Sequence, residues 1–400
     1  MVHVAERTTR IETSASSVAT QRARELRAEG YDIISLTQGQ PDFDTPDHVL
    51  EAATKAMHAG ETRYTPVMGT PALRDAIRFK FKRDNSLAYT DDQVMASNGG
   101  KQIVYNALMS TVEPGDEVIV TAPYWVSYPE MTKFSGGVPI EVRCREESGF
   151  KLTPEQLETA ITSKTRWLIL NSPNNPSGAV YSGHELRILA EVLQPYERIM
   201  VMCDDIYEHI IFEGVEMATM AEAAPFMFDR TLTLNGVSKA YAMTGWRIGI
   251  AGGPEGLIKT MSKLQNQSTG NPSSVSQAAA IAALTGPQKL VFERTKAFQD
   301  RRDRVLEMLN DVSGLSCRRP EGAFYVYPNC KGLIGRKPPN GKVMKNDRDV
   351  VIYLMEEGGV AAVHGEAYGL SPHFRLSFAD SMENLEEACR RIQSAIQALA

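Results

Sequence analysis

The sequence lacks the features that mark several protein classes. It has only five cysteines, which are widely scattered and include no C-x-x-C pair, so a disulfide framework is not expected. No apolar run approaches the ~18 residues of a membrane-spanning helix, and residues 1–17 lack the apolar core of a signal peptide. We therefore expect a cytoplasmic protein with reduced, buried thiols and no membrane partner.

The charge balance also excludes a class of partners. The chain carries 43 basic and 49 acidic residues, a formal net charge of −6, so it offers no basic field for a nucleic-acid backbone. Apolar residues make up 42% and charged residues 23% of the chain, which is ordinary for a globular protein. At 400 residues, one large domain or two unequal domains are expected.

Between about residues 45 and 276, short apolar runs alternate with helical patterns. This alternation predicts a parallel sheet covered by helices on both faces, an α/β arrangement. The expected strands are 116–123, 165–173, 199–205, 230–236 and 246–253. The expected helices are 69–84, 154–161 and 183–193, where apolar residues recur at spacings of three and four.

The last third of the chain has a different pattern. A long charged helix is predicted over 289–311, followed by the aromatic stretch 321–328, a loop rich in Gly, Pro and Lys over 331–346, and an amphipathic helix over 383–400. We expect residues 46–291 to form a large domain. Residues 1–45 and 292–400 are expected to form a small α+β domain.

Polar residues follow four of the predicted strands. Trp125 comes after the first of these, the segment NSPNNPSG (171–178) after the second, Asp204 ends the third, and Ser238-Lys239 follows the fourth. In an open parallel sheet the ligand crevice lies outside the carboxyl ends of the strands, so these groups are expected to converge. The edge would present an aromatic ring, an amide, a carboxylate and an amine.

A phosphate site is predicted beside this edge. Gly99 and Gly100 lead directly into a helical pattern, and glycines at a helix N-terminus expose free N–H groups to an anion. Arg247 adds a positive charge. A phosphate site together with an aromatic ring, a carboxylate and a lysine suggests pyridoxal phosphate, whose aldehyde forms an imine with a lysine amine.

Six motifs resemble those of the class I (aspartate-type) aminotransferases, which are pyridoxal-phosphate enzymes of fold type I. The matching segments are TQGQPDFDTP, APYWVSYPE, NSPNNPSG, CDDIYEH, SKAYAMTGWRIG and HFRLSFA. The motifs are distributed over nearly the whole chain. Their order and spacing resemble those of the bacterial aspartate/prephenate subgroup. The resemblance implies a large domain with a mainly parallel seven-stranded sheet flanked by helices, and a small α+β domain.

The resemblance implies a role for each residue that would contact the cofactor. Lys239 would form the imine and then act as the base, and Asp204 would pair with the pyridine nitrogen. Tyr207 and Asn175 would donate to the ring's phenolate oxygen, and Trp125 would stack on the ring. The phosphate would be held by Arg247 and the backbone of Gly99, Gly100 and Lys101. Many members carry a serine where this chain has Gly236, so Ser238 is expected to supply a hydroxyl instead.

The resemblance also implies how a substrate would bind. Arg375 would hold the α-carboxylate as a bidentate fork, and Gly39 would lie against the same group. Trp125 and Asn175 would contact the substrate as well, and Lys101 would reach a distal carboxylate. Tyr64 resembles a tyrosine that contacts the phosphate bound by a neighbouring subunit, which implies a homodimer with shared sites.

Several alternatives stay open at this stage. Aspartate with 2-oxoglutarate is the leading substrate pair, with aromatic amino acids, alanine or prephenate as alternatives, and a β-lyase could use the same lysine and arginine. Glu12 stands near a position that is basic in some relatives and would repel a dicarboxylate if it faced the pocket. His184 and His209 lack metal-ligand spacing, so no metal site is expected. A DNA-binding regulator is not expected, because the segment before residue 45 is short.

Overall fold

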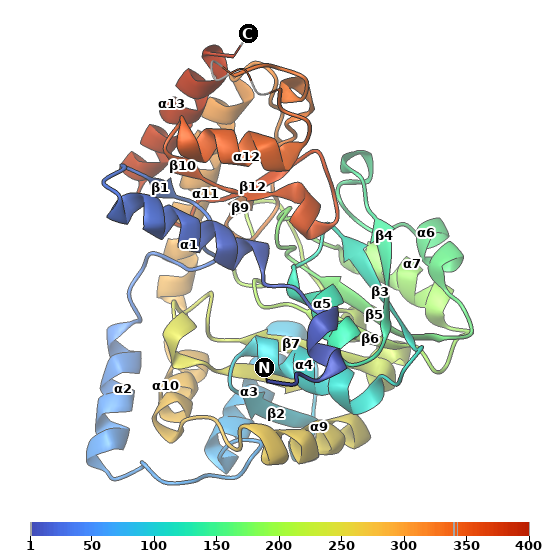
Figure 1. Cartoon of the computed structure of the whole chain (residues 1–400). Coiled ribbons are helices and arrows are strands. Elements are labelled where there is room, and N and C mark those ends of the chain that lie inside the picture. Colours follow the sequence, from blue (N-terminus) through green and yellow to red (C-terminus); the bar gives the residue numbers. More distant parts are fainter. Residues whose placement is uncertain (1, 339–340, 342, 400) are drawn as a thin grey trace.

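A mostly parallel sheet of seven strands organises the computed structural model, which describes residues 2–338, 341 and 343–399 (Figure 1). In spatial order the strands are β2 Val94–Ser97, β8 Gly249–Gly252, β7 Thr231–Gly236, β6 Met200–Asp204, β5 Thr165–Asn171, β3 Glu117–Ala122 and β4 Val138–Arg143. Strand β8 runs antiparallel to both of its neighbours, and the other pairs are parallel. The predicted fold class is confirmed.

Side chains along each central strand alternate between two buried layers. Trp167 and Ile169 of β5 belong to the core on one face of the sheet, whereas Leu168 and Leu170 belong to the core on the other. Strands buried on both faces read as continuous apolar runs in a sequence. This is why β3, β5, β6 and β7 are predictable from the sequence.

Two strands escaped prediction and one was predicted too long. Strand β2 has only four residues, and β4 is a partly exposed edge strand that contains Pro139, so neither gives an apolar run. The strand predicted over 246–253 was wrong at its start. Residues Thr244–Trp246 form a 3-10 turn and Arg247 has φ 56°, so β8 begins only at Gly249.

Helices cover both faces of the sheet (Figure 1). One face packs against α4 Gly100–Thr111, α5 Ser127–Phe134 and α9 Glu255–Ser268. The other face packs against α2 Asp47–His58, α3 Pro71–Asn85, α6 Pro154–Ala160, α7 Gly183–Leu193, α8 Met220–Ala223 and α10 Ser274–Thr285. The predicted helices over 69–84, 154–161 and 183–193 correspond to α3, α6 and α7. Capping boxes at Thr153 and Ser182 begin the last two.

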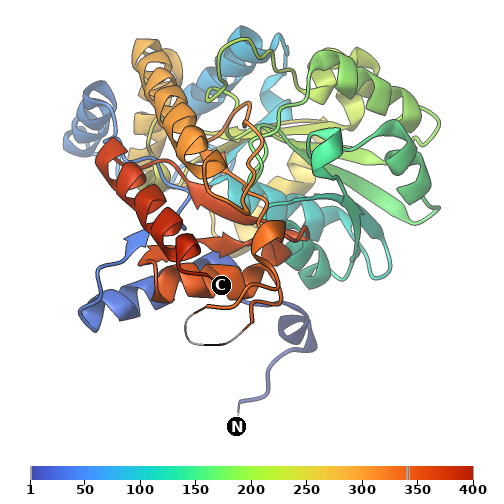
Figure 2. The same cartoon turned by 90° about the horizontal axis from the view of Figure 1, so that it is seen from above.

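A second group of elements lies above the sheet edge. It contains α1 Ala15–Ala28, α11 Lys289–Asn310, α12 Asp347–Glu356, α13 Met382–Gln397, the parallel pair β1 Ile34–Ser35 and β10 Val360–Ala361, and the antiparallel sheet of β11 Val363–His364, β12 Phe374–Ser377 and β9 Tyr325–Val326. Figure 2 shows α11 and α13 side by side, and a shared apolar core joins them to α12 and β12. The predicted helices over 289–311 and 383–400 are thus present as α11 and α13.

Short 3-10 helices connect the main elements at Glu6–Arg10, Asp91–Gln93, Glu146–Ser148, Pro225–Arg230, Thr244–Trp246, Lys331–Leu333 and Gly365–Tyr368. Residues 339, 340 and 342 of the predicted loop, and residue 400 of the last predicted helix, lie outside the described residues. Over the described ranges, no helix combines the length and apolar character needed to cross a membrane.

We propose that the large domain comprises residues 46–291 and the small domain residues 1–45 and 292–400. This division is supported by the placement of the strands, because every strand of the seven-stranded sheet falls between residues 94 and 252. It is also supported by the pairing of β1 with β10, which ties the N-terminal segment to the last third of the chain.

Candidate active site

A cavity of about 1040 Å³ opens where β3, β5, β6 and β7 end and the N-terminal segment and β12 pass over the sheet. Eleven of the predicted site residues line it: Gly39, Gly100, Lys101, Trp125, Asn175, Asp204, Tyr207, Ser238, Lys239, Arg247 and Arg375. The rule that polar groups converge at the carboxyl edge of a parallel sheet therefore holds for this chain.

Lys239 lies in the turn after β7 and points into the cavity. Its Nζ donates a hydrogen bond to the carbonyl oxygen of Gly39 at 2.7 Å. Burial, followed by the charges of Arg247 and Arg375, lowers the pKa of this amine to about 8, although Asp204 opposes the fall. The neutral, nucleophilic form of the amine is therefore accessible near neutral pH.

Asp204 ends β6 and is buried beneath the same cavity. Burial raises the pKa of its carboxyl to about 6, although a hydrogen bond from Tyr128 opposes the rise. The Tyr128 hydroxyl donates to Oδ2 at 2.6 Å, and the Ile206 N–H donates to Oδ1 at 3.3 Å. The sequence reasoning missed Tyr128, whose only signal is its place one helical turn after Trp125 on α5.

The hydroxyl of Tyr207 forms a hydrogen bond with that of a second tyrosine, Tyr325, which was not predicted from the sequence. The Tyr207 and Tyr325 hydroxyl oxygens are 2.7 Å apart, and burial raises the pKa of Tyr325 to about 12. A Cβ at Gly39 would lie 2.2 Å from the Tyr325 hydroxyl oxygen. A glycine is therefore required at position 39 by the close approach of this ring.

Arg375 reaches the cavity from β12. Its Nη1 donates to Oδ1 of Asn175 at 2.9 Å and its Nη2 donates to the carbonyl oxygen of Thr37. The guanidinium is 3% exposed and stacks 4.5 Å from the Tyr325 ring centroid, while its Nε has no hydrogen-bond partner. A buried donor without a partner is costly, so the site is prepared for an acceptor such as a carboxylate.

The residues predicted to hold a phosphate lie together at the N-terminus of α4. Gly99 precedes the helix with φ 91°, and a Cβ there would lie 2.3 Å from Nη2 of Arg247. Gly99 therefore supports this group from behind and does not itself line the cavity. A Cβ at Gly236 would lie 2.9 Å from Cδ1 of Ile206 and 3.0 Å from the backbone oxygen of Ile248, so the serine found in many aminotransferases would require these neighbours to shift. Ser238 lines the cavity instead.

Lys101 and Trp125 form a cation–π pair at the cavity wall. Nζ of Lys101 lies 4.9 Å from the Trp125 ring centroid. Burial, followed by the charge of Arg247, lowers the pKa of Lys101. Lys101, Arg247 and Arg375 thus line the cavity together with Lys239, and Arg22 and Arg24 of the N-terminal segment line it as well.

Two residues singled out in the sequence lie away from the cavity of their own chain. Tyr64 is 99% exposed, and Glu12 is exposed, with its backbone N–H donating to Oε2 of Glu130 at 2.7 Å. The neighbouring Thr13 and Ser14 line the cavity, whereas Glu12 does not.

Comparison with known proteins identifies the family. The model of the family "Aminotransferase class I and II" matches residues 31–392. The chain is 53% identical to a probable aspartate/prephenate aminotransferase from Rhizobium leguminosarum and 52% identical to an aspartate/prephenate aminotransferase from Cereibacter sphaeroides, over 98% of each chain.

Solved structures agree with this assignment. The aspartate aminotransferase from Rhizobium meliloti superposes with a TM-score of 0.98, with 50% identity and full coverage of both chains. The aspartate aminotransferase from Thermus thermophilus with maleate gives a TM-score of 0.92 at 41% identity and covers 99% of this chain and 100% of that one. The chain therefore belongs to the aminotransferase class I and II family.

Proposed function

We propose that this aminotransferase uses pyridoxal phosphate to move the amino group of aspartate or glutamate to a 2-oxo acid such as 2-oxoglutarate. One observation carries the proposal: the Lys239 amine, with its lowered pKa, shares a single cavity with Asp204, Arg247 and Arg375. The amine, the carboxylate, the phosphate site and the substrate fork are all provided by one chain.

The residues of the cavity fit pyridoxal phosphate. The N-terminus of α4, Ser238 and Arg247 form a donor set suited to a phosphate dianion, and a side chain at Gly99 would collide with that arginine. Asp204 is a buried carboxylate that can pair with a pyridinium nitrogen, and Trp125 can cover a ring face. When bound, the cofactor supplies an aldehyde that condenses with amines and a ring that accepts electrons.

The chain's own side chains would then bind, orient and move protons. Lys239 would take the proton from the substrate's α-carbon and return it in the reverse direction, since the lowered pKa of its amine makes the neutral form accessible near physiological pH. Tyr207 and Asn175 would donate hydrogen bonds to the ring oxygen. Arg375 would hold the α-carboxylate, and Gly39 leaves room beside it.

The charge of the cavity supports a dicarboxylic substrate. Arg375 provides one fork for a carboxylate, and Lys101 provides a second cation in the same cavity beside Trp125. The Thermus thermophilus relative was solved with maleate, a dicarboxylate. Prephenate is supported as a second acceptor by the names of the relatives and by the cavity volume of about 1040 Å³, whereas alanine, aromatic amino acids and a β-lyase reaction are less well supported.

The visible spectrum of the purified protein tests the proposal. With pyridoxal phosphate bound, addition of aspartate or glutamate without any oxo acid should convert the absorption band in a single turnover and release no ammonia. Conversion by alanine or phenylalanine alone would refute the preference for acidic substrates. Release of ammonia would support the β-lyase alternative, and a protein that stays colourless with added cofactor would refute the cofactor assignment.

Replacement of Lys101 by alanine should lower kcat/KM for dicarboxylic substrates selectively. Loss of one charge-assisted contact, worth about 1.5–3 kcal/mol, predicts a fall of roughly tenfold to a hundredfold in kcat/KM for aspartate. Alanine, which has no distal carboxylate, should react within about twofold of the parent rate. Equal losses for aspartate and alanine in steady-state assays would refute the proposed role.

We propose that the active unit is a homodimer in which Tyr64 serves the neighbouring site. This is supported by the 99% exposure of Tyr64 and its absence from the cavity of its own chain. Neither Tyr64→Ala nor Lys239→Ala should be fully active alone. Mixing the two under refolding or exchange conditions should restore about a quarter of the parent activity, because hybrid dimers hold one intact site. No gain on mixing would refute the shared site.

We also propose that the protein works in the cytoplasm. All five cysteines are free and buried, as expected in a reducing compartment. Fractionation of the native host should place the activity with the cytoplasmic fraction, and its recovery from a periplasmic extract would contradict the proposal.

A further inference from the structure

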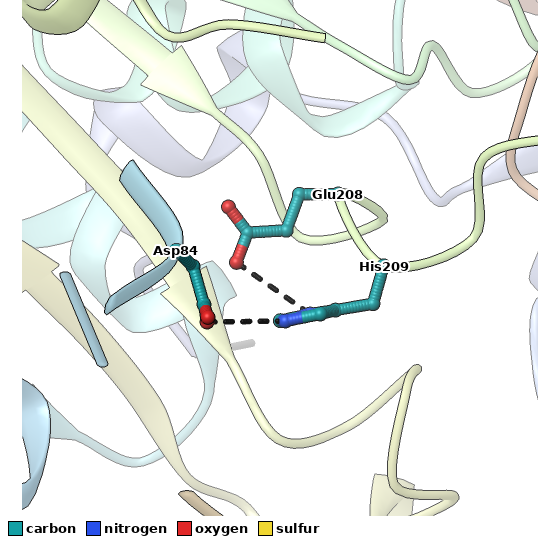
Figure 3. A group of neighbouring side chains, drawn as sticks. All are labelled: Asp84, Glu208 and His209. Carbon is teal, nitrogen blue, oxygen red and sulfur yellow. Dashed lines mark hydrogen bonds and ion pairs between the residues drawn. The ribbon is translucent and has the colours of Figure 1, made fainter. Parts of the chain in front are cut away.

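The segment that carries Asp204 and Tyr207 has a second side that faces away from the cavity. Asp204, Ile206 and Tyr207 line the cavity. On the outer side, Glu208 and His209 meet the C-terminal end of α3 (Figure 3). Residues that follow one another along the chain thus contact the proposed cofactor site on one side and a helix of the large domain on the other.

The outer contacts centre on a buried lysine. The side chain of Lys80 is 1% exposed and pairs with Glu208, which is 6% exposed. Nζ of Lys80 also donates to Oδ1 of Asn85 at 2.7 Å, and Nδ2 of Asn85 donates to Oε2 of Glu208 at 2.8 Å. The three side chains therefore close a triangle of two hydrogen bonds and one ion pair.

His209 extends the cluster. Its Nε2 lies 3.2 Å from Oδ2 of Asp84, and its Nδ1 lies 3.5 Å from Oε1 of Glu208 (Figure 3). Its backbone carbonyl oxygen accepts a hydrogen bond from the Thr295 hydroxyl at 2.8 Å. Both ends of the 208–209 dipeptide are therefore fixed.

Asp84, Glu208 and His209 have ligand atoms within 4.8 Å of one another, a geometry that could hold a metal ion. The ammonium of Lys80 already supplies the cation, since it pairs with Glu208 and lies 3.8 Å from Oδ2 of Asp84. Although burial opposes ionisation of Glu208, the charge of Lys80 and the hydrogen bond from Asn85 hold its pKa below the usual value. The cluster is a protein-built ion pair, and a metal is not needed to neutralise it.

A buried ion pair contributes little net stability, because desolvation of both ions offsets their attraction. Such a pair instead restricts the positions of the side chains that it joins, because few arrangements keep both ions paired. We infer that the Lys80–Glu208 pair, locked by Asn85, is a positioning device that fixes Tyr207 and Asp204 in the cavity from behind. This inference rests on the proposed cofactor site.

The double variant Lys80→Met/Glu208→Gln tests the inference by removing both charges of the pair, while Asp84 keeps its two hydrogen bonds from Arg83. Both substitutions keep the side-chain size, and the net charge of the pair stays zero. A displaced Tyr207 would stabilise the ring's anionic oxygen less well. The pH midpoint of the bound cofactor's visible absorption should therefore rise by about half a unit. The value of kcat/KM for aspartate should fall roughly tenfold.

The pair Lys151–Glu185, whose side chains are 17% and 37% exposed, offers a control ion pair of the same residue types that does not line the cavity. Its Nζ and Oε1 atoms are 2.5 Å apart, and glutamine at 185 can preserve the capping box at Ser182. Lys151→Met/Glu185→Gln should leave the midpoint and kcat/KM unchanged. If the Lys80 double variant matches this control in both measurements, the cluster is only structural and the inference is overturned.

A single substitution that retains both charges provides a second test if the double variant does not fold. Asn85→Ser removes both hydrogen bonds of the lock but retains the two charges, and it should shift the midpoint in the same direction by a smaller amount. An unchanged midpoint and unchanged kinetics in Asn85→Ser would overturn the inference. Failure of the proposed function would be distinguishable, because the parent protein itself would then show no cofactor band.

Discussion

Replacement of Lys239 by alanine is expected to reduce turnover by about four orders of magnitude or more, since the variant loses the amine that we propose bonds the cofactor and then moves the proton. Its Nζ points into the cavity and donates to the Gly39 carbonyl oxygen at 2.7 Å. The amine of Lys101 is held against the Trp125 ring and cannot substitute without leaving that contact. Single-turnover and steady-state assays with aspartate would measure the loss.

A second readout separates this loss from misfolding. Borohydride treatment of the parent loaded with pyridoxal phosphate should add the mass of the reduced cofactor to the chain, whereas the Lys239→Ala variant should gain none. Lys101→Ala is the matched control, because it removes another lysine of the same cavity and should keep the mass gain. Ordinary activity in the Lys239 variant would contradict the assignment of the lysine.

Much of the fold and of the site could be predicted from the sequence. Strands buried on both faces give apolar runs, and residues just beyond them, such as Asp204 and Lys239, are brought to one edge by parallel topology. The edge strand β4 gave no such run, because its side chains are half-exposed and it contains a proline. The sequence therefore predicts the buried strands and the polar residues that follow directly at their carboxyl ends.

Contacts between distant segments could not be predicted in this way. Tyr325 and Tyr207 are hydrogen-bonded although 118 residues separate them in the sequence, and Tyr128 and Asp204 although 76 residues separate them. Hydrogen bonds between such side chains produce no periodic pattern in the sequence. The position of Glu12 depends on the path of the N-terminal segment, which local pattern does not determine. Lys80 reads as an ordinary helix-surface lysine in the sequence, and only the packing of α3 against the 204–209 segment buries it.

Opposite pKa shifts in the cavity have one physical origin. Burial disfavours charge on any group, so it raises the pKa of Asp204 to about 6 and lowers that of Lys239 to about 8. The two values therefore approach each other. A buried carboxylate that can pair with a cation and an amine with a lowered pKa suit the roles proposed for Asp204 and Lys239.

Replacement of Arg375 by alanine is the second change with a large expected effect. The guanidinium is buried and bonds Asn175 and Thr37, and its Nε has no partner in the described structure. Loss of a bidentate, charge-assisted contact to the α-carboxylate, together with misplacement of the α-carbon, predicts a fall of roughly a thousandfold in kcat/KM for every amino acid. The loss should be similar for aspartate and alanine, unlike that of Lys101→Ala.

Arg375→Lys distinguishes the shape of the guanidinium from its charge. A lysine keeps the positive charge but cannot bond Asn175, Thr37 and a carboxylate with one planar fork, so it should recover only a small part of the lost activity. The thermal midpoint of both variants should be measured, because Asn175 and the Thr37 carbonyl lose a donor. If Arg375→Lys retained parent kinetics, or if Arg375→Ala impaired only dicarboxylic substrates, the α-carboxylate would have to be bound elsewhere in the cavity.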